Sequence, residues 1–174
     1  YIANEFAGIF HEFGSSVTLV NRSDDILRGY DEQIRDRLLQ ISMGKGIQCR
    51  FNTTCKEIVK QGDGSLQATL TDGEVLTVDC VMFAIGRVPN TDGLGLEAAG
   101  VVLDKGAVKV DDDSCTNVPS IYAVGDVTNR VQLTPVAIRE GQAFADTVFG
   151  GKPWRVDYDC IPSAVFSHPP IGAV

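Results

Sequence analysis

In the stretch Gly125-Asp126-Val127-Thr128-Asn129-Arg130-Val131-Gln132-Leu133-Thr134-Pro135-Val136-Ala137, a glycine and an acid precede a Leu-Thr-Pro segment. A short apolar run, Ile121–Val124, comes before it, and apolar residues at helical spacing follow it over 138–149. The pattern predicts a strand that ends at Gly-Asp and a helix that begins near Thr134-Pro135, where a proline fits because its missing N–H would be unpaired anyway. Such a helix start attracts anions, and a carboxylate at a strand end can bind a ribose or ribityl hydroxyl. The spacing alone also fits an ordinary turn that Asp126 merely caps.

The composition is that of a globular protein without a membrane span. Of the 174 residues, 44% are hydrophobic and 22% are charged, and no apolar run approaches the length of a membrane helix. The formal charge of -8 argues against nucleic acid and against anionic membranes as partners.

The cysteines and histidines limit which cellular compartment and which metal sites are expected. The five cysteines are isolated, which fits reduced thiols and predicts a cytoplasmic protein. No residues have zinc-ligand spacing, and there are only two histidines, so no metal site is expected. The chain starts at Tyr1 within an apolar periodic run and stops at Val174 in an apparent strand, so we expect an internal segment of a longer protein.

The N-terminal residues predict half of a dinucleotide-binding unit. Apolar residues fall on one helical face up to Gly14, and Val17–Val20 then reads as a buried strand. A helix followed by a buried strand is the second half of a βαβ unit. The glycine-rich loop of such a unit would stand just before Tyr1, with Ala3 as its last small residue.

Two arginines follow this strand. An acid at that place would bind the 2′-hydroxyl of NAD, whereas an arginine accommodates the 2′-phosphate of NADP. Arg22 and Arg28 stand there, and two guanidinium groups can hold one phosphate. The alternative is a pair of solvated surface arginines, whose positive field Asp24 and Asp25 would weaken.

The other elements follow from periodicity and turn signals. We expect, in chain order, a helix over 31–46, strands over 47–51, 55–60, 66–71 and 74–78, a buried strand over 79–85, a short helix over 94–100, a strand over 108–110, a solvated acidic turn over 111–113, and a linker over 152–160.

Three stretches resemble the glutathione reductase family, flavoenzymes that pass electrons from NADPH through FAD to a disulfide. These are Gly125-Asp126 with Leu133–Ala137, the turn Ala84-Ile85-Gly86-Arg87-Val88-Pro89-Asn90, and Phe166-Ser167-His168-Pro169-Pro170-Ile171-Gly172. They occur in the family's order and the resemblance covers essentially the whole chain.

The resemblance implies roles for individual residues. For FAD, it implies that Gly125 and Asp126 hold the ribityl chain and that Thr134 lies at the flavin ring. For NADPH, it implies a ring of Tyr1 over the nicotinamide pocket, Glu5 at the nicotinamide edge, backbone contacts from Ile2, and phosphate binding by Arg22 and Arg28. Gly86 and Gln132 complete the NADPH set. No catalytic residue is expected here, because a Cys-x4-Cys pair and the family's catalytic His–Glu pair are absent.

The implied fold class is α/β. It comprises a Rossmann-like NADPH-binding βαβ domain without its first strand (residues 1–84), the second segment of an FAD-binding domain (85–151), and the start of an α+β interface or dimerisation domain (152–174).

The implied parent protein is a homodimeric, NADPH-dependent, FAD-containing disulfide reductase, with glutathione disulfide as the expected substrate. Gln142 stands where some members have an arginine that contacts the substrate carboxylate, so trypanothione disulfide remains an alternative. A dihydrolipoamide dehydrogenase would carry an acid in place of Arg22. Taken alone, the chain also fits a nucleotide-binding module without turnover.

Overall fold

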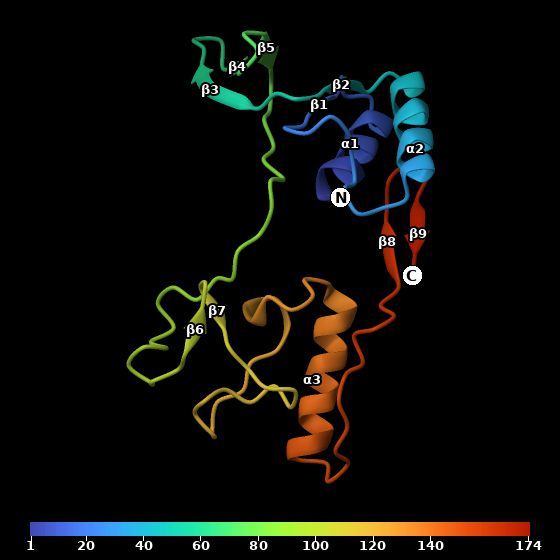
Figure 1. The fold of residues 1–174 in the computed structure, drawn as a ribbon. Helices are drawn as coiled ribbons and strands as arrows, with labels where there is room; N and C mark the ends of the chain where they lie inside the picture. The colour runs from blue at the N-terminus through green and yellow to red at the C-terminus, as the bar shows by residue number, and fades with distance from the viewer. The chain divides into compact units, whose positions relative to one another are not determined.

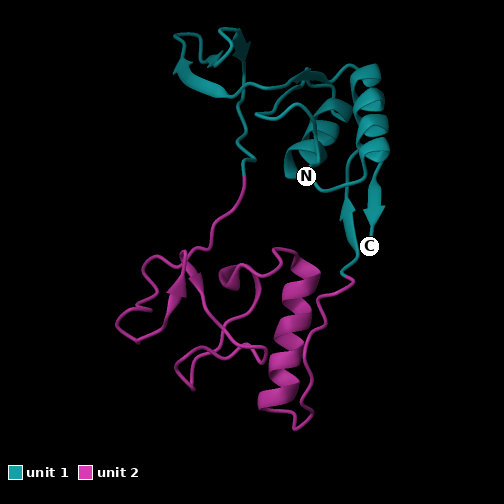
Figure 2. Cartoon of the chain, viewed as in Figure 1, with its two compact units in different colours: residues 1–85, 161–174 teal, residues 86–160 magenta.

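The computed structural model describes residues 1–174, and the chain divides into two compact units, coloured separately in Figure 2. Unit 1 comprises residues 1–85 and 161–174, and unit 2 comprises residues 86–160. The division into three domains that the sequence suggests stays a prediction.

Unit 1 contains two helices and seven short strands (Figure 1). They are α1 (Ile2–Glu12), β1 (Thr18–Val20), α2 (Glu32–Lys45), β2 (Gln48–Arg50), β3 (Cys55–Lys60), β4 (Leu66–Leu70), β5 (Val75–Val78), β8 (Ser163–Val165) and β9 (Ile171–Ala173).

A parallel β1-α2-β2 crossover forms the centre of unit 1. β1 pairs with β2 in parallel, with Leu19 opposite Cys49. Local chemistry sets the ends of α2: the Asp31 carboxylate accepts a hydrogen bond from the Ile34 N–H at 3.2 Å, and Gly46 takes the left-handed conformation with φ 114°. The α/β class expected from the sequence is confirmed.

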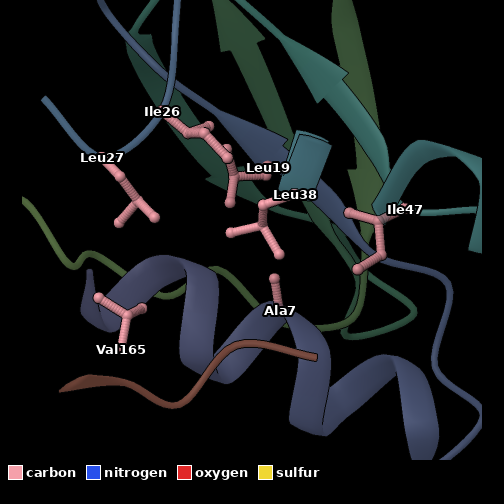
Figure 3. Close-up of a cluster of buried hydrophobic side chains, with 7 residues drawn as sticks. All are labelled: Ala7, Leu19, Ile26, Leu27, Leu38, Ile47 and Val165. Atoms are coloured by element: carbon pink, nitrogen blue, oxygen red, sulfur yellow. The ribbon is translucent and has the colours of Figure 1, made fainter. Parts of the chain in front are cut away.

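The core of unit 1 joins segments that are distant in the sequence. Figure 3 shows its seven buried residues, which come from α1, β1, the loop after β1, α2, the residue before β2, and β8: Ala7, Leu19, Ile26, Leu27, Leu38, Ile47 and Val165. Burying one large aliphatic side chain contributes about 1.5–3 kcal/mol. This cluster therefore fixes both α1 and the loop after β1, which carry candidate cofactor residues.

The antiparallel meander β3-β4-β5 matches the expected strands. Gly64 and Gly73 supply positive φ angles of 92° and 93° at its two turns. Arg50 of β2 reaches the second turn, where it donates to both carboxylate oxygens of Glu74, from Nε at 2.6 Å and from Nη2 at 2.9 Å.

Unit 2 is built from a hairpin, a 3-10 turn and one long helix. These are β6 (Leu103–Asp104), β7 (Ala107–Val108), η1 (Gly125–Thr128) and α3 (Thr134–Val148). The helix begins where the sequence predicts, with a proline in its first turn. Its inner face carries buried Val136, Glu140 and Ala143, and Phe144 packs against Tyr122 with ring centroids 4.9 Å apart.

Three expected elements of the central chain do not form. Residues 79–85 are not a buried strand: they have no paired strand, and Phe83 and Ile85 are 59% and 88% exposed. Residues 94–100 form turns instead of a helix, because Gly95 and Gly100 at their ends both have positive φ. The run 121–124 makes only an isolated antiparallel bridge from Tyr122 to Cys115, so it is not a full strand.

The segment 111–113, expected to be a solvated turn, and the segment 152–160, expected to be a linker, make specific contacts. Arg155 pairs with Asp112 and Asp113, so the turn 111–113 is bound to the stretch that follows α3. The Trp154 indole N–H donates to the Asp146 carboxylate at 3.0 Å. Residues 152–160 therefore pack within unit 2 and are not a simple linker.

Candidate functional site

The first turn of α1 offers unpaired backbone donors. Tyr1 is the N-cap residue, and no side chain caps the helix. The N–H groups of the first turn of a helix have no intrahelical acceptor and lie at the positive end of the helix dipole. This end of α1, which begins at Ile2, therefore suits the pyrophosphate of a dinucleotide.

Glu5 lies in the same turn and already has one partner. Its carboxylate accepts a hydrogen bond from the backbone N–H of Phe166 at 2.9 Å. Phe166 directly follows β8, so Glu5 ties α1 to the C-terminal strands of unit 1. The family resemblance implies that Glu5 lies at the nicotinamide edge, and the contact with Phe166 was not expected.

Arg22 and Arg28 both lie exposed on the loop after β1, and neither makes an ion pair or a side-chain hydrogen bond. Buried Ile26 and Leu27 anchor the loop in the core of unit 1, and the Asn21 side chain donates to the Asp25 carbonyl at 2.6 Å. A fixed loop thus presents two guanidinium groups with all their donors available.

One of the two acids between these arginines is neutralised. The Asp25 carboxylate lies 2.7 Å from Arg35 Nη1 and also accepts from the Ile26 N–H at 2.6 Å. Arg35 comes from α2, so only the tertiary structure supplies this cation. Because Arg35 pairs with it, the Asp25 carboxylate weakens the positive field of Arg22 and Arg28 less than its charge alone would suggest.

The Gly125-Asp126 turn in unit 2 is buried at the glycine and exposed at the acid. Gly125 has φ 75°, and a Cβ atom there would lie 3.1 Å from the Ala137 methyl group. Glycine is therefore required both by the backbone conformation and by the close approach of α3. Thr134 is the first residue of α3, whose N-terminus has no side-chain cap.

Arg87 connects η1 with the loop that precedes α3. One guanidinium nitrogen, Nη2, lies 3.0 Å from the Asp126 carboxylate and donates to the Gln132 carbonyl at 2.6 Å. Gly86, its neighbour, has φ 125°. Arg87 thus brings Gly86, Asp126 and Gln132 into one region. It belongs to the stretch 84–90, and no role was predicted for it.

A second unforeseen residue lies behind the turn. Glu140 of α3 is 1% exposed and accepts hydrogen bonds from the Gly125 N–H at 2.5 Å and from the Tyr158 hydroxyl at 2.7 Å. Burial and the bond to Glu140 raise the pKa of the Tyr158 hydroxyl. The sequence offered one signal for Glu140, an acid among the apolar positions of a helix.

The candidate residues therefore form two sets, one in each unit. Tyr1, Ile2, Glu5, Arg22 and Arg28 belong to unit 1, and Gly86, Gly125, Asp126, Gln132 and Thr134 belong to unit 2. No group of acids, histidines and cysteines has the arrangement of a metal site. Burial raises the pKa of the Cys49 thiol, which disfavours the reactive thiolate.

Residues 1–141 match the family described as pyridine nucleotide-disulphide oxidoreductase. The chain belongs to this family. Since the match covers most of the chain, the family resemblance is confirmed, and the motifs that begin at Ala84 and Gly125 lie within the matched residues.

Among curated relatives in this family, the chain is similar to glutathione reductases and trypanothione reductases. The chain is 50% identical over 175 residues to a glutathione reductase of Burkholderia cepacia, covering 100% of this chain and 39% of the relative. It is 49% identical over 176 residues to a trypanothione reductase of Trypanosoma congolense, covering 99% and 36%. The chain thus spans less than two-fifths of the length of these relatives.

Solved structures show the same fold. A flavoprotein disulfide reductase induced by HOCl, RclA of Escherichia coli, superposes with a TM-score of 0.91 at 30% identity, covering 99% of this chain and 40% of that one. LpdA of Mycobacterium tuberculosis superposes with a TM-score of 0.88 at 30% identity, covering 97% and 37%.

Family membership implies FAD and NADPH as the cofactors, and the residues present fit both. Uncapped starts of α1 and α3 offer backbone donors to phosphate and flavin oxygens, and Arg22 and Arg28 are free for a 2′-phosphate. No helix combines the length and the apolar character that crossing a bilayer requires.

Proposed function

We propose that this chain is the cofactor-binding part of an NADPH- and FAD-dependent disulfide reductase whose substrate is glutathione disulfide. The reaction consumes NADPH, a proton and one disulfide and yields NADP⁺ and two thiols. The observation that carries the proposal is the exposed, unpaired pair Arg22 and Arg28 on the loop after β1. The family match over residues 1–141 also supports the proposal.

In this proposal the residues bind and orient, and none of them performs the chemistry. Bound FAD supplies the group that takes up hydride from NADPH and passes two electrons to a disulfide. Arg22 and Arg28 bind the 2′-phosphate, the start of α1 at Ile2 binds the pyrophosphate, and Tyr1 and Glu5 flank the nicotinamide.

The residues of unit 2 complete the two cofactor sets. Asp126 accepts a hydrogen bond from a ribityl hydroxyl, with Gly125 allowing the turn, and Thr134 lies at the flavin ring. Gly86 and Gln132 contact NADPH. The five cysteines here are all free and none forms a Cys-x4-Cys pair, so we assign the redox dithiol and the catalytic His–Glu pair to other residues of the whole protein.

The identity of the disulfide substrate is the most specific part of this proposal. The glutathione reductase of Burkholderia cepacia and the trypanothione reductase of Trypanosoma congolense are almost equally similar to this chain. Gln142, at the position that differs among glutathione reductases, is exposed and donates to Asp146 at 2.9 Å. The whole protein is proposed to be a cytoplasmic homodimer.

The deciding experiment is a matrix of steady-state assays on the whole protein. Glutathione disulfide and trypanothione disulfide are each tested with NADPH and with NADH. We expect a kcat/KM at least about tenfold higher for glutathione disulfide than for trypanothione disulfide, and the same preference for NADPH over NADH. Faster turnover of trypanothione disulfide would reassign the substrate, and no disulfide reduction with either would leave a nucleotide-binding module.

A further inference from the structure

A carboxylate is buried behind the Gly125-Asp126 turn, and the roles proposed above do not use it. Glu140 is 1% exposed, which is rare for an acid because burying an unpaired charge is costly. Both of its oxygens have donors, the Gly125 N–H at 2.5 Å on Oε2 and the Tyr158 hydroxyl at 2.7 Å on Oε1.

A cation stands behind this pair. The Tyr158 hydroxyl accepts a hydrogen bond from Arg130 Nη1 at 3.1 Å, and the Arg130 guanidinium lies 5.7 Å from the centre of the Tyr158 ring. Arg130 also donates to the Asp111 carbonyl. The chain of contacts therefore runs from Arg130 through the Tyr158 hydroxyl to Glu140 and ends on the Gly125 N–H. Hydrogen bonds linked in this way reinforce one another.

The end of this chain of contacts is the backbone next to the flavin candidate. The Gly125 N–H is held by Glu140, and its carbonyl accepts from the Thr128 hydroxyl at 2.8 Å. Both polar groups of Gly125 are thus fixed. Asp126, the next residue, is held at its carboxylate by Arg87.

We propose that Glu140 is a positioning residue for the flavin: its buried carboxylate fixes the Gly125-Asp126 turn so that the Asp126 carboxylate meets the ribityl chain. This inference rests on the proposed function, because it assigns Glu140 to the same FAD site. Tyr158, whose hydroxyl is itself held by Arg130, orients the Glu140 carboxylate.

The test uses Glu140→Gln in the whole protein, purified as holoenzyme and then stripped of FAD. A glutamine keeps the shape and one acceptor for the Gly125 N–H, but it loses the charge and presents an NH2 group to Tyr158. The readouts are the dissociation constant of FAD, measured by quenching of flavin fluorescence, and the visible absorption spectrum of the bound flavin. We expect FAD to bind about tenfold more weakly with a shifted spectrum.

Asp146→Asn is the matched control. Asp146 is an acid on the same helix that accepts from Gln142 and Trp154, away from the Gly125-Asp126 turn. This variant is expected to lower the melting temperature while leaving FAD affinity and the flavin spectrum unchanged. A Glu140→Gln protein that loses only melting temperature, as the control does, overturns the inference because its role would then be structural.

Tyr158→Phe keeps the test open if Glu140→Gln fails to fold. It removes one donor to Glu140 and leaves the bond to the Gly125 N–H, so about threefold weaker FAD binding is expected. An affinity equal to that of the wild type overturns the inference. The proposed function fails separately, through a wild-type protein that binds no FAD at all.

Discussion

The Arg87 guanidinium holds the Asp126 carboxylate at 3.0 Å and, through the same nitrogen, the backbone carbonyl of Gln132 at 2.6 Å. Asp126 lies within η1, and Gln132 lies two residues before the first residue of α3. The pair is about half exposed, with side-chain exposures of 40% for Arg87 and 49% for Asp126. One side chain therefore sets the shape of the proposed flavin loop.

Arg87→Gln is expected to weaken FAD binding by about two- to fivefold, because an exposed ion pair contributes below about 1 kcal/mol. Flavin fluorescence titration of the whole protein measures this change. Arg139→Gln is the control, because Arg139 lies over the Trp154 ring, with no bond to Asp126 or Gln132. Equal affinity in the Arg87 variant and the control would show that Arg87 does not shape the loop.

Arg22→Gln and Arg28→Gln are expected to raise the KM for NADPH by about tenfold or more each, because a hydrogen bond to a charged group contributes about 1.5–3 kcal/mol. The KM for NADH should change little, since NADH has no 2′-phosphate. Arg37→Gln on α2 is a matched control, an exposed arginine of the same unit without an ion pair. A parallel rise in both KM values would contradict phosphate binding by Arg22 and Arg28.

Gly125→Ala is expected to destabilise the protein by about 1–2 kcal/mol, because an L-residue in the left-handed region pays that cost. The close approach of Ala137 to the new Cβ atom adds to it. Gly141→Ala on α3 is the opposite control: its Cβ atom would meet open space, so a gain of about 0.5–1 kcal/mol is expected. Urea denaturation measures both, and a neutral Gly125 variant would refute the strained turn.

Acid is expected to destabilise the protein through paired carboxylates such as Glu74. Hydrogen bonds from the Arg50 guanidinium lower the pKa of Glu74 in the folded state. The folded state then binds fewer protons than the unfolded state, so this stabilisation is present above the unfolded pKa of about 4.3 and is lost as the pH falls through the folded pKa. Asp113 beside Arg155 acts in the same direction.

Thermal unfolding between pH 6 and pH 3 checks this expectation. Glu74→Gln should flatten the fall of the melting temperature with acid. Glu57→Gln on β3 is the control, because its exposed carboxylate has no ion pair or hydrogen bond. Identical pH profiles for the wild type and the Glu74 variant would rule out the proposed contribution of this pair.

Elements with local signals were predictable from the sequence. Both limits of α2 were predictable because its N-cap Asp31 and its left-handed C-cap Gly46 act within one turn of chain. The same holds for the start of α3 at Thr134-Pro135 and for the turns at Gly64 and Gly73. The strand expected over 79–85 failed because apolar residues predict burial only where another strand pairs with them, and pairing is not local.

The sequence by itself determined the residue types and motifs that mark a nucleotide- and flavin-binding chain: Arg22 and Arg28 after a buried strand, and Gly125-Asp126 before a helix that begins near Thr134-Pro135. Only the tertiary structure decided which charges meet. Asp25 pairs with Arg35, Asp126 with Arg87, and buried Glu140 with the Gly125 N–H and the Tyr158 hydroxyl. These partners lie 10, 39, 15 and 18 residues apart along the chain. Hydrogen bonds and ion pairs act over a few ångströms, so folding of the chain must first bring such residues together.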